Sequence, residues 1–210
     1  MKSFTENYEK FKQSVISIRN GEADAAFVGE GAESEVWRVQ VDRSDYAVKL
    51  IKPLSLRGRR RDVQKAVQEK VDTASRAEGI AGLEQLQAAS VEEGVVVYEF
   101  AKGLSLARKS IRSVSKVPQS QLVALVDTVS QASRVGIEFD GWNRTGDNVF
   151  YETEKGFTLI DYWLSGRPID AERNLSYVVK SLGSSSMLGD ELYKILENRS
   201  KLKPNLANAE

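Results

Sequence analysis

Two residues with oxygen-bearing side chains, Asn148 and Asp161, enclose a short segment that has the sequence pattern of a β-hairpin. The segment contains two apolar runs separated by the turn sequence Glu-Thr-Glu-Lys-Gly. Because a hairpin returns the chain to its starting end, we expect the two side chains to lie close together. A carboxylate and an amide oxygen are hard ligands of the kind that Mg²⁺ accepts, with phosphate oxygens and water in its other positions. The segment therefore predicts one half of a phosphoryl-transfer site, and the alternative is a surface hairpin that merely ends in these residues.

The sequence of 210 residues contains no Cys and no His, which narrows the chemistry that it can perform. Disulfides, thiolate nucleophiles, the usual zinc ligands and imidazole general bases are all excluded. Carboxylates, Lys, Ser, Thr and Tyr remain as groups that could take part in catalysis.

The composition indicates a folded protein without a general attraction for nucleic acid or membranes. Hydrophobic residues make up 41% and charged residues 29% of the chain, which suits one or two small domains. Lys+Arg and Asp+Glu are each 30, so the formal net charge is zero. No apolar run approaches the roughly 18 residues that span a bilayer, and the N-terminus lacks the plan of a secretory signal. We expect a monomer that works in an aqueous compartment, with no nucleic-acid or membrane partner.

A glycine-rich turn near residue 30 could approach phosphate groups. Gly29 and Gly31 follow an apolar run, and Ser34 stands where a third glycine would complete G-x-G-x-x-G. Glycine lets a backbone come close to phosphate oxygens, and a small polar Ser could fit the third position. Alternating apolar residues predict three short antiparallel strands in this region. A strand directly after the glycines is inconsistent with a dinucleotide-binding fold, which requires a helix there.

The third predicted strand carries Lys49, whose alternation puts it on one face with Ala47 and Ile51. A lone lysine in a strand is usually just solvated. The order here, however, is a glycine turn, a strand, a reversal and a strand with lysine, which is the plan of the nucleotide lobe of a kinase. We therefore predict that Lys49 contacts a nucleotide phosphate.

The segment after the third strand predicts a helix that could give Lys49 an acidic partner. Glu69 and Asp72 lie near the edge of its apolar stripe, and we predict that Glu69 reaches Lys49, as a glutamate does in protein kinases. The alternative is a helix whose charges are all solvated. The basic cluster at 57–61 is interpreted as a solvated helix start rather than a nucleic-acid site. The apolar stripe consists of Val63, Val67, Val71 and Ala74.

A buried strand leads into a short connector whose backbone groups could bind the edge of an adenine ring. In this interpretation the backbone groups of Glu99 and Ala101 face the ring, and Tyr98 lies at the back of the pocket. Gly103 marks the expected lobe boundary. A helix is predicted at 119–135, with its apolar side turned inward; that side consists of Leu122, Leu125, Val126 and Val129.

The N-terminal residues predict an amphipathic helix that ends at Asn20-Gly21 and packs onto the rest of the protein. Together these elements predict an N-terminal helix at 1–24, a nucleotide-binding lobe at 25–101 and a reduced helical lobe at 102–210. The aromatic and apolar stripe of the first helix consists of Phe4, Tyr8, Phe11, Val15 and Ile18.

The ordered set of motifs between Val28 and Trp163 resembles the protein-kinase fold in a minimal form. The motifs are G-E-G-A-E-S-E-V, Y-A-V-K, Y-E-F, D-(x7)-N-V-F and L-I-D-Y-W. The resemblance implies an α+β, two-lobed fold, with ATP and Mg²⁺ as cofactors. It also implies that Asp140 is the catalytic aspartate and that Asn148 and Asp161 are the metal ligands. The nucleotide-binding residues that it implies are Gly29, Gly31, Ser34, Val36, Ala47, Lys49, Glu69, Glu99 and Ala101.

The catalytic loop departs from the kinase pattern. Glu138 takes the place of the usual His, and D-F-G is replaced by Asp-Tyr-Trp. The interval from Asp140 to Asn148 is eight positions, which is three longer than in H-R-D-x-x-x-x-N. Under strict spacing Asn143 would occupy the aspartate position and the protein would be a pseudokinase. We prefer Asp140, because Ile-Glu-Phe-Asp reproduces the apolar lead-in.

Little of the chain follows Asp161, and this truncation is similar to that of the minimal kinases that bacteria inject into host cells by type III secretion. Thr-Gly-Asp-Asn-Val-Phe-Tyr followed by Ile-Asp resembles the OspG and NleH group, and the overall length resembles the HopBF family. The resemblance implies a virulence effector in the host cytoplasm that phosphorylates Ser or Thr of a host protein such as a heat-shock chaperone of the ninety-kilodalton class. The alternatives are a small-molecule phosphotransferase and a non-catalytic binding module.

Overall fold

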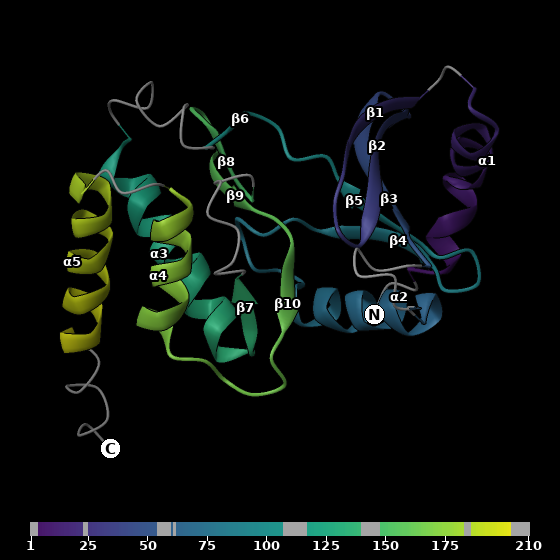
Figure 1. Cartoon of the computed structure of the whole chain (residues 1–210). Coiled ribbons are helices and arrows are strands. Elements are labelled where there is room, and N and C mark those ends of the chain that lie inside the picture. The colour runs from purple at the N-terminus through teal and green to yellow at the C-terminus, as the bar shows by residue number, and fades with distance from the viewer. Residues whose placement is uncertain are drawn as a thin grey trace. The chain divides into compact units, whose positions relative to one another are not determined.

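The computed structural model describes residues 4–22, 25–53, 60, 62–106, 117–139, 148–182 and 186–202. The chain divides into two compact units (Figure 1). Unit 1 comprises Met1–Glu78 and Glu84–Ala101, and unit 2 comprises Gly79–Leu83 and Lys102–Glu210. This division differs from the three continuous ranges expected, because the N-terminal helix joins the sheet and a short internal segment belongs to unit 2. Of the described helices, none combines the length and apolar character needed to cross a bilayer.

Unit 1 contains an antiparallel sheet of five strands in the order β1-β2-β3-β5-β4. The three strands predicted after residue 25 are present as β1, β2 and β3. The turn between β2 and β3 consists of Asp42 and Arg43, both with positive φ, as a tight two-residue hairpin requires. The strands are β1 (Ala25–Glu30), β2 (Ser34–Val41), β3 (Ser44–Ile51), β4 (Leu86–Ser90) and β5 (Val95–Glu99).

One face of this sheet packs against the N-terminal helices, a short 3₁₀ helix η1 (Glu6–Lys10) and α1 (Lys12–Asn20). The predicted packing stripe is confirmed, with the exception of Phe4, which packs with the residues of the opposite face. Gly21 ends α1 in the left-handed conformation, with φ of 71°, as the Asn-Gly signal predicted. The buried residues of the stripe are Tyr8, Phe11, Val15 and Ile18.

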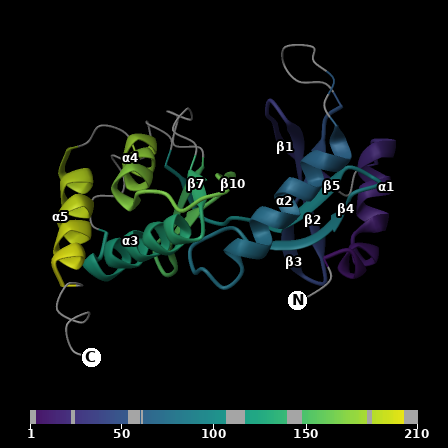
Figure 2. The same cartoon turned by 90° about the horizontal axis from the view of Figure 1, so that it is seen from below.

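The opposite face of the sheet packs against α2 (Val63–Ala77) (Figure 2). The helix begins at Asp62, whose side chain accepts a hydrogen bond of 3.0 Å from the backbone N–H of Lys65. Val67 and Ala74 are buried against Ala47 and other apolar residues of β3, β4 and β5. Helix α2 therefore covers part of the sheet face that carries Lys49.

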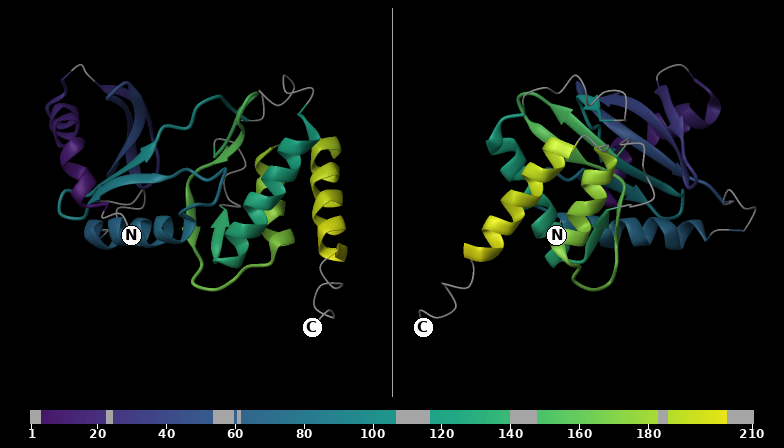
Figure 3. Two further views of the ribbon diagram at one scale, coloured as in Figure 1. Left: turned by 180° about the vertical axis from the view of Figure 1, so that it is seen from behind. Right: turned by 60° about the vertical axis from the view of Figure 1, so that its left-hand side comes forward.

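Unit 2 combines three helices with short strands (Figure 3). The predicted inward side of α3 is confirmed, since Leu122, Leu125, Val126 and Val129 are all buried. One small sheet has the order β6-β8-β9, and β7 pairs with β10. The elements are β6 (Leu104–Ser105), α3 (Gln119–Arg134), β7 (Ile137–Phe139), β8 (Val149–Glu152), β9 (Gly156–Leu159), β10 (Tyr162–Leu164), α4 (Ala171–Ser181) and α5 (Ser186–Leu202).

The segment Gly79–Leu83 lies between α2 and β4 in sequence but packs inside unit 2. Thr128 on α3 donates a side-chain hydrogen bond of 2.7 Å to the carbonyl of Ala81. The N–H of Leu159 on β9 donates to the carbonyl of Gly82 at 2.8 Å. Gly82 has a φ of 82°, and a Cβ there would lie 2.7 Å from Thr128 Oγ1, so glycine is required at this position.

Candidate functional site

The β8–β9 hairpin brings the two predicted metal ligands to one end of the same element. The ladder runs from Glu152 opposite Gly156 to Val149 opposite Leu159. Beyond it, the N–H of Ile160 donates a hydrogen bond of 3.0 Å to the carbonyl of Asn148. A backbone hydrogen bond thus connects Asn148 to Ile160, the residue before Asp161. The predicted hairpin is confirmed.

Asp161 has an unusual backbone conformation, with a φ of 55°. Left-handed conformations are uncommon for non-glycine residues and cost about 1–3 kcal/mol, so they persist where the surroundings impose them. The other described non-glycine residues with positive φ, Asp42 and Arg43, form a hairpin turn that demands this conformation. Asp161 lies in no such turn, and its side chain is exposed to solvent. Strain of this kind is typical of functional residues.

The chemistry of this end of the hairpin fits Mg²⁺ better than a metal that needs many protein ligands. In the described part of the chain no three residues of the types His, Cys, Asp and Glu gather to form a metal cluster. Asn148 and Asp161 would supply two oxygen ligands. Mg²⁺ commonly uses one or two protein carboxylates together with substrate phosphates and water.

The strand that follows Asp161 runs beside the strand that precedes residue 140. In the β10–β7 pairing, Tyr162 lies opposite Phe139, and Trp163 lies opposite Glu138. The rings of Tyr162 and Phe139 meet edge to face, with centroids 6.4 Å apart. The predicted catalytic aspartate, Asp140, and its competitor Asn143 lie outside the described residues.

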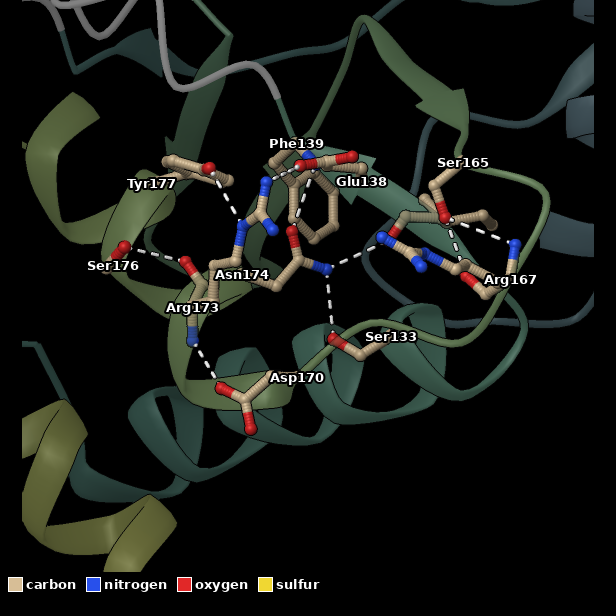
Figure 4. A network of polar contacts seen from close by, with 11 residues as sticks. Ser133, Glu138, Phe139, Ser165, Arg167, Asp170, Arg173, Asn174, Ser176 and Tyr177 are labelled. Atoms are coloured by element: carbon tan, nitrogen blue, oxygen red, sulfur yellow. Dashed lines mark hydrogen bonds and ion pairs between the residues drawn. The ribbon is translucent and has the colours of Figure 1, made fainter.

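Strand β7 is attached to α4 by Asn174, a fully buried residue that the sequence analysis missed (Figure 4). Its side-chain oxygen accepts a hydrogen bond of 3.0 Å from the N–H of Phe139. Its side-chain nitrogen donates to the carbonyl of Ile137 and to Ser133 Oγ, each at 2.9 Å. The sequence signal for this contact was an Asn beside an apolar residue on the inward face of a helix. A buried Asn needs hydrogen-bond partners, so this position could have suggested such a contact.

Glu138, which stands at the position of the usual kinase His, is engaged in an ion pair with Arg173 on α4. The distance from Arg173 Nη2 to Glu138 Oε1 is 3.2 Å. Arg173 also donates a hydrogen bond to the hydroxyl of Tyr177 (Figure 4). Its hydrogen bond and charge interaction with Tyr177, followed by the charge of Glu138, raise the pKa of Arg173. Glu138 therefore acts as an ion-pair partner of α4 in this structure.

In unit 1, the sheet register aligns several predicted nucleotide residues. Gly29 lies opposite Val36, and Val36 lies opposite Lys49. Ala47 is two residues from Lys49 on the same face of β3. A bulge between Phe27 and Gly29 leaves Val28 more than half exposed. The register thus brings Gly29, Val36, Ala47 and Lys49 to one region of the sheet.

The turn between β1 and β2 is closed by a hydrogen bond of 2.9 Å from the N–H of Gly31 to the carbonyl of Ser34. Two lysines outside the turn contact it. Lys52 Nζ donates to the carbonyl of Gly31 at 3.0 Å and forms an ion pair with Glu30. Lys70 on α2 lies 3.7 Å from Glu33. The glycine turn is therefore acidic, and at least two of its carboxylates have lysine partners.

Lys49 does not pair with Glu69, and the expected partner is corrected by the structure. Lys49 Nζ lies 3.2 Å from Oε2 of Glu84, and the two side chains are 8% and 3% exposed. The side chain of Glu69 is 67% exposed, and it forms an ion pair of 4.0 Å with Lys65 on the same helix. The prediction failed because Glu69 lies on the solvent side of α2, whereas Glu84 lies in the segment that leads into β4.

The last residue of β5 and the first residue of the connector after it both donate backbone hydrogen bonds. The N–H of Glu99 donates to the carbonyl of Gln85, and the N–H of Phe100 donates to the carbonyl of Asp45, both at 3.1 Å. Tyr98 is buried, and the Lys49 ammonium lies 4.6 Å from the centre of its ring. Tyr98 therefore lies beside the candidate phosphate lysine.

Comparison with known proteins establishes the fold. No family model matches the sequence, and no curated protein matches it. Among solved structures, 1204 chains match. One is the apo structure of a plant pseudokinase, GRMZM2G135359, with 13% sequence identity and a TM-score of 0.50 over 75% of this chain. The chain has a protein-kinase-like fold. The match spans 63% of the pseudokinase, so this chain covers less than two thirds of that protein's length.

Proposed function

We propose that the chain is an ATP- and Mg²⁺-dependent protein kinase that phosphorylates the hydroxyl of Ser or Thr. The observation that carries the proposal is the end of the β8–β9 hairpin. There the backbone of Asn148 is bonded to Ile160, and Asp161 is held in a left-handed conformation. A strained acidic residue beside an amide ligand, in a kinase-like fold, supports a magnesium site for a nucleotide.

Each unit contributes different groups in this proposal. When bound, Mg-ATP supplies the phosphoryl group, and its metal ion supplies positive charge that neutralises the phosphate oxygens during transfer. In unit 2, Asn148 and Asp161 hold the metal ion. In unit 1, the Lys49 ammonium neutralises phosphate oxygens, and the backbone of Gly29 and Gly31 approaches them.

The remaining nucleotide contacts are proposed for the sheet and the connector. Val36 and Ala47 pack against the base, because both lie on the sheet region that carries Lys49. Ser34 closes the glycine turn through its carbonyl. Backbone groups of Glu99 and Ala101 bind the edge of the adenine.

Asp140 is proposed as the residue that orients the acceptor hydroxyl and accepts its proton. It follows directly after β7, whose last residue is bonded to the buried Asn174. An aspartate can accept the proton as it leaves, whereas an asparagine such as Asn143 can only orient the hydroxyl. We therefore assign this role to Asp140.

The resemblance to the HopBF family and to the OspG and NleH group supports a narrower proposal. In it, the chain is a secreted bacterial effector, and its acceptor is a Ser or Thr of a host heat-shock chaperone of the ninety-kilodalton class. The measurement is the transfer of labelled phosphate to the purified chaperone, compared with small aminoglycosides as acceptors. Labelling of the aminoglycosides alone would overturn the protein-kinase assignment.

A non-catalytic binding module is the second candidate, and the acidic glycine turn favours it. Glu30 and Glu33 place carboxylates in the turn that would approach phosphates in a kinase. The negative charges of these carboxylates repel a polyphosphate, although Lys52 and Lys70 partly neutralise them. In this case the protein would bind a partner without transferring phosphate.

Thermal unfolding with and without ligand tests whether the chain binds the nucleotide that the kinase proposal requires. A ligand that binds only the folded state raises the melting temperature by mass action. We expect millimolar ATP with Mg²⁺ to raise it, and Asp161→Ala to remove most of the metal-dependent part. An unchanged melting curve for the wild-type chain would favour the binding module.

A further inference from the structure

We propose that Glu84 is the positioning residue for Lys49, and that it fixes this lysine independently of helix α2. The inference rests on the proposed function, because it concerns the lysine that would contact the nucleotide phosphates. Glu84 lies after the end of α2 at Ala77 and before the start of β4 at Leu86, outside both elements.

The contact between Lys49 and Glu84 is buried. Nζ and Oε2 are 3.2 Å apart, and neither side chain is more than 8% exposed. The ring of Tyr98 lies 4.6 Å from the same ammonium. Charges attract each other more strongly in such a site than in water, and removing one partner of a buried ion pair is strongly destabilising. The carboxylate of Glu84 therefore holds the ammonium in one place.

The backbone directly after Glu84 is held by a hydrogen bond within unit 1. The carbonyl of the next residue, Gln85, accepts a hydrogen bond of 3.1 Å from the N–H of Glu99, the last residue of β5. This hydrogen bond anchors the backbone beside Glu84 within unit 1, the unit that also contains Lys49.

Helix α2 contributes no acidic group to this contact. Its buried residues are apolar or a threonine, namely Val67, Thr73, Ala74 and Ala77. Glu69 is 67% exposed, and exposed Asp72 accepts a hydrogen bond from Gln68 at 2.9 Å. A rotation of α2 therefore cannot break the Lys49–Glu84 contact by removing a carboxylate. The position of the Lys49 side chain depends on the sheet and on the segment before β4. A movement of α2 that regulates this protein would therefore have to change something other than the Lys49–Glu84 contact.

The first test measures how well Lys49 is held, and it does not need catalysis. The full-length wild-type chain, Glu84→Gln and Glu69→Gln are acetylated briefly with acetic anhydride, and the modification of each lysine is followed by mass spectrometry. Exposed Lys194 on α5 serves as the internal standard, because it lies on a different element from both substituted residues. We expect Lys49 to be protected in the wild-type chain and in Glu69→Gln, and to react about tenfold faster in Glu84→Gln, because a broken buried ion pair is strongly destabilising. Equal protection of Lys49 in all three proteins would overturn the inference.

The second test measures phosphoryl transfer with Mg-ATP and a generic protein acceptor. Glu84→Gln should lower kcat per folded molecule by about 10- to 100-fold, with a smaller change in KM for ATP, because a misplaced lysine no longer meets the transferring phosphate. Glu84→Asp, which keeps the charge, should recover part of the rate and remain folded. Exposed Glu92→Gln is the matched control and should match the wild-type chain.

The outcomes separate this inference from the proposed function. Full activity in folded Glu84→Asp together with full activity in Glu84→Gln would overturn the positioning role. A loss in Glu69→Gln without a loss in Glu84→Gln would do the same. A wild-type chain that neither binds Mg-ATP nor transfers phosphate would instead overturn the proposed function, and the acetylation result would still decide whether Glu84 holds Lys49.

Discussion

Lys49 in unit 1 and Asp161 in unit 2 are held in place by different physical means. The lysine is buried and fixed by a partner charge, Glu84. The aspartate is exposed, and backbone hydrogen bonds beside it hold it in a left-handed conformation. A lysine that contacts phosphate directly needs a precisely positioned side chain, whereas a residue that binds a metal ion must leave the ion accessible to water and phosphate. The difference therefore suits the two roles that we propose.

The largest expected effect comes from removing the buried lysine. Lys49→Ala should lower turnover by at least about 10²-fold, because the positive charge that opposes the transferring phosphate is lost. Initial rates of labelled phosphate transfer measure it, with the exposed Lys65→Ala as the matched control. A rate near that of the wild-type chain would show that the buried lysine has only a structural role.

The second prediction concerns the polar contact that supports unit 2. Asn174→Ala should destabilise the chain by roughly 2–4 kcal/mol, because the N–H of Phe139 and the carbonyl of Ile137 lose a buried partner. Urea unfolding, followed by fluorescence, gives the free energy of unfolding. Ser176→Ala on the same helix, at a partly buried position, is the control. A change of less than about 0.5 kcal/mol would mean that β7 does not depend on Asn174.

A smaller effect tests the strain at the metal end of the hairpin. Asp161→Gly should raise the free energy of unfolding without ligand by about 1 kcal/mol, because glycine adopts a positive φ without a steric cost. It should also remove the magnesium-dependent stabilisation by ATP. Thermal unfolding in the presence of EDTA and of Mg-ATP measures both effects. A glycine variant that is less stable than Asp161→Ala would contradict the strain argument.

The smallest effect is expected for the lysine pairs that contact the glycine turn. Lys70→Ala should change the stability of the chain by less than about 1 kcal/mol, because its partner Glu33 is more than half exposed. The variant should also weaken ATP binding slightly, since an acidic turn loses a neutralising charge. Titration calorimetry at low and high salt would reveal this effect, which should fade as salt increases. Tighter ATP binding in Lys70→Ala would contradict it.

The sequence predicted the elements whose signals are local. The β8–β9 hairpin was predicted from two apolar runs and a turn, and the inward side of α3 was predicted from its period, because both patterns report burial directly. The end of α1 at Gly21 was also predicted, since Asn-Gly has a simple conformational meaning. These local features also explain why Asn148 and Asp161 were expected together.

The contacts that the sequence analysis missed join residues far apart in the chain. Glu84 lies 35 positions from Lys49, and Asn174 lies 35 positions from Phe139. Both pairings depend on how a connecting segment or a helix is placed against a sheet, which periodicity does not record. Glu69 was chosen for its place on a helix, yet the apolar stripe of α2 turned it toward solvent. Buried polar partners therefore had to come from the three-dimensional structure.

The segment Gly79–Leu83 has a consequence for how such a protein can be rearranged. The chain passes from one unit to the other after residues 78, 83 and 101, so neither unit is an uninterrupted piece of the sequence. A gene fusion with one crossover point after Ala101 would separate Ala81 and Gly82 from Thr128 and Leu159, their hydrogen-bond partners. A single crossover therefore cannot exchange either unit whole, and a working recombinant would have to exchange the five-residue segment along with unit 2.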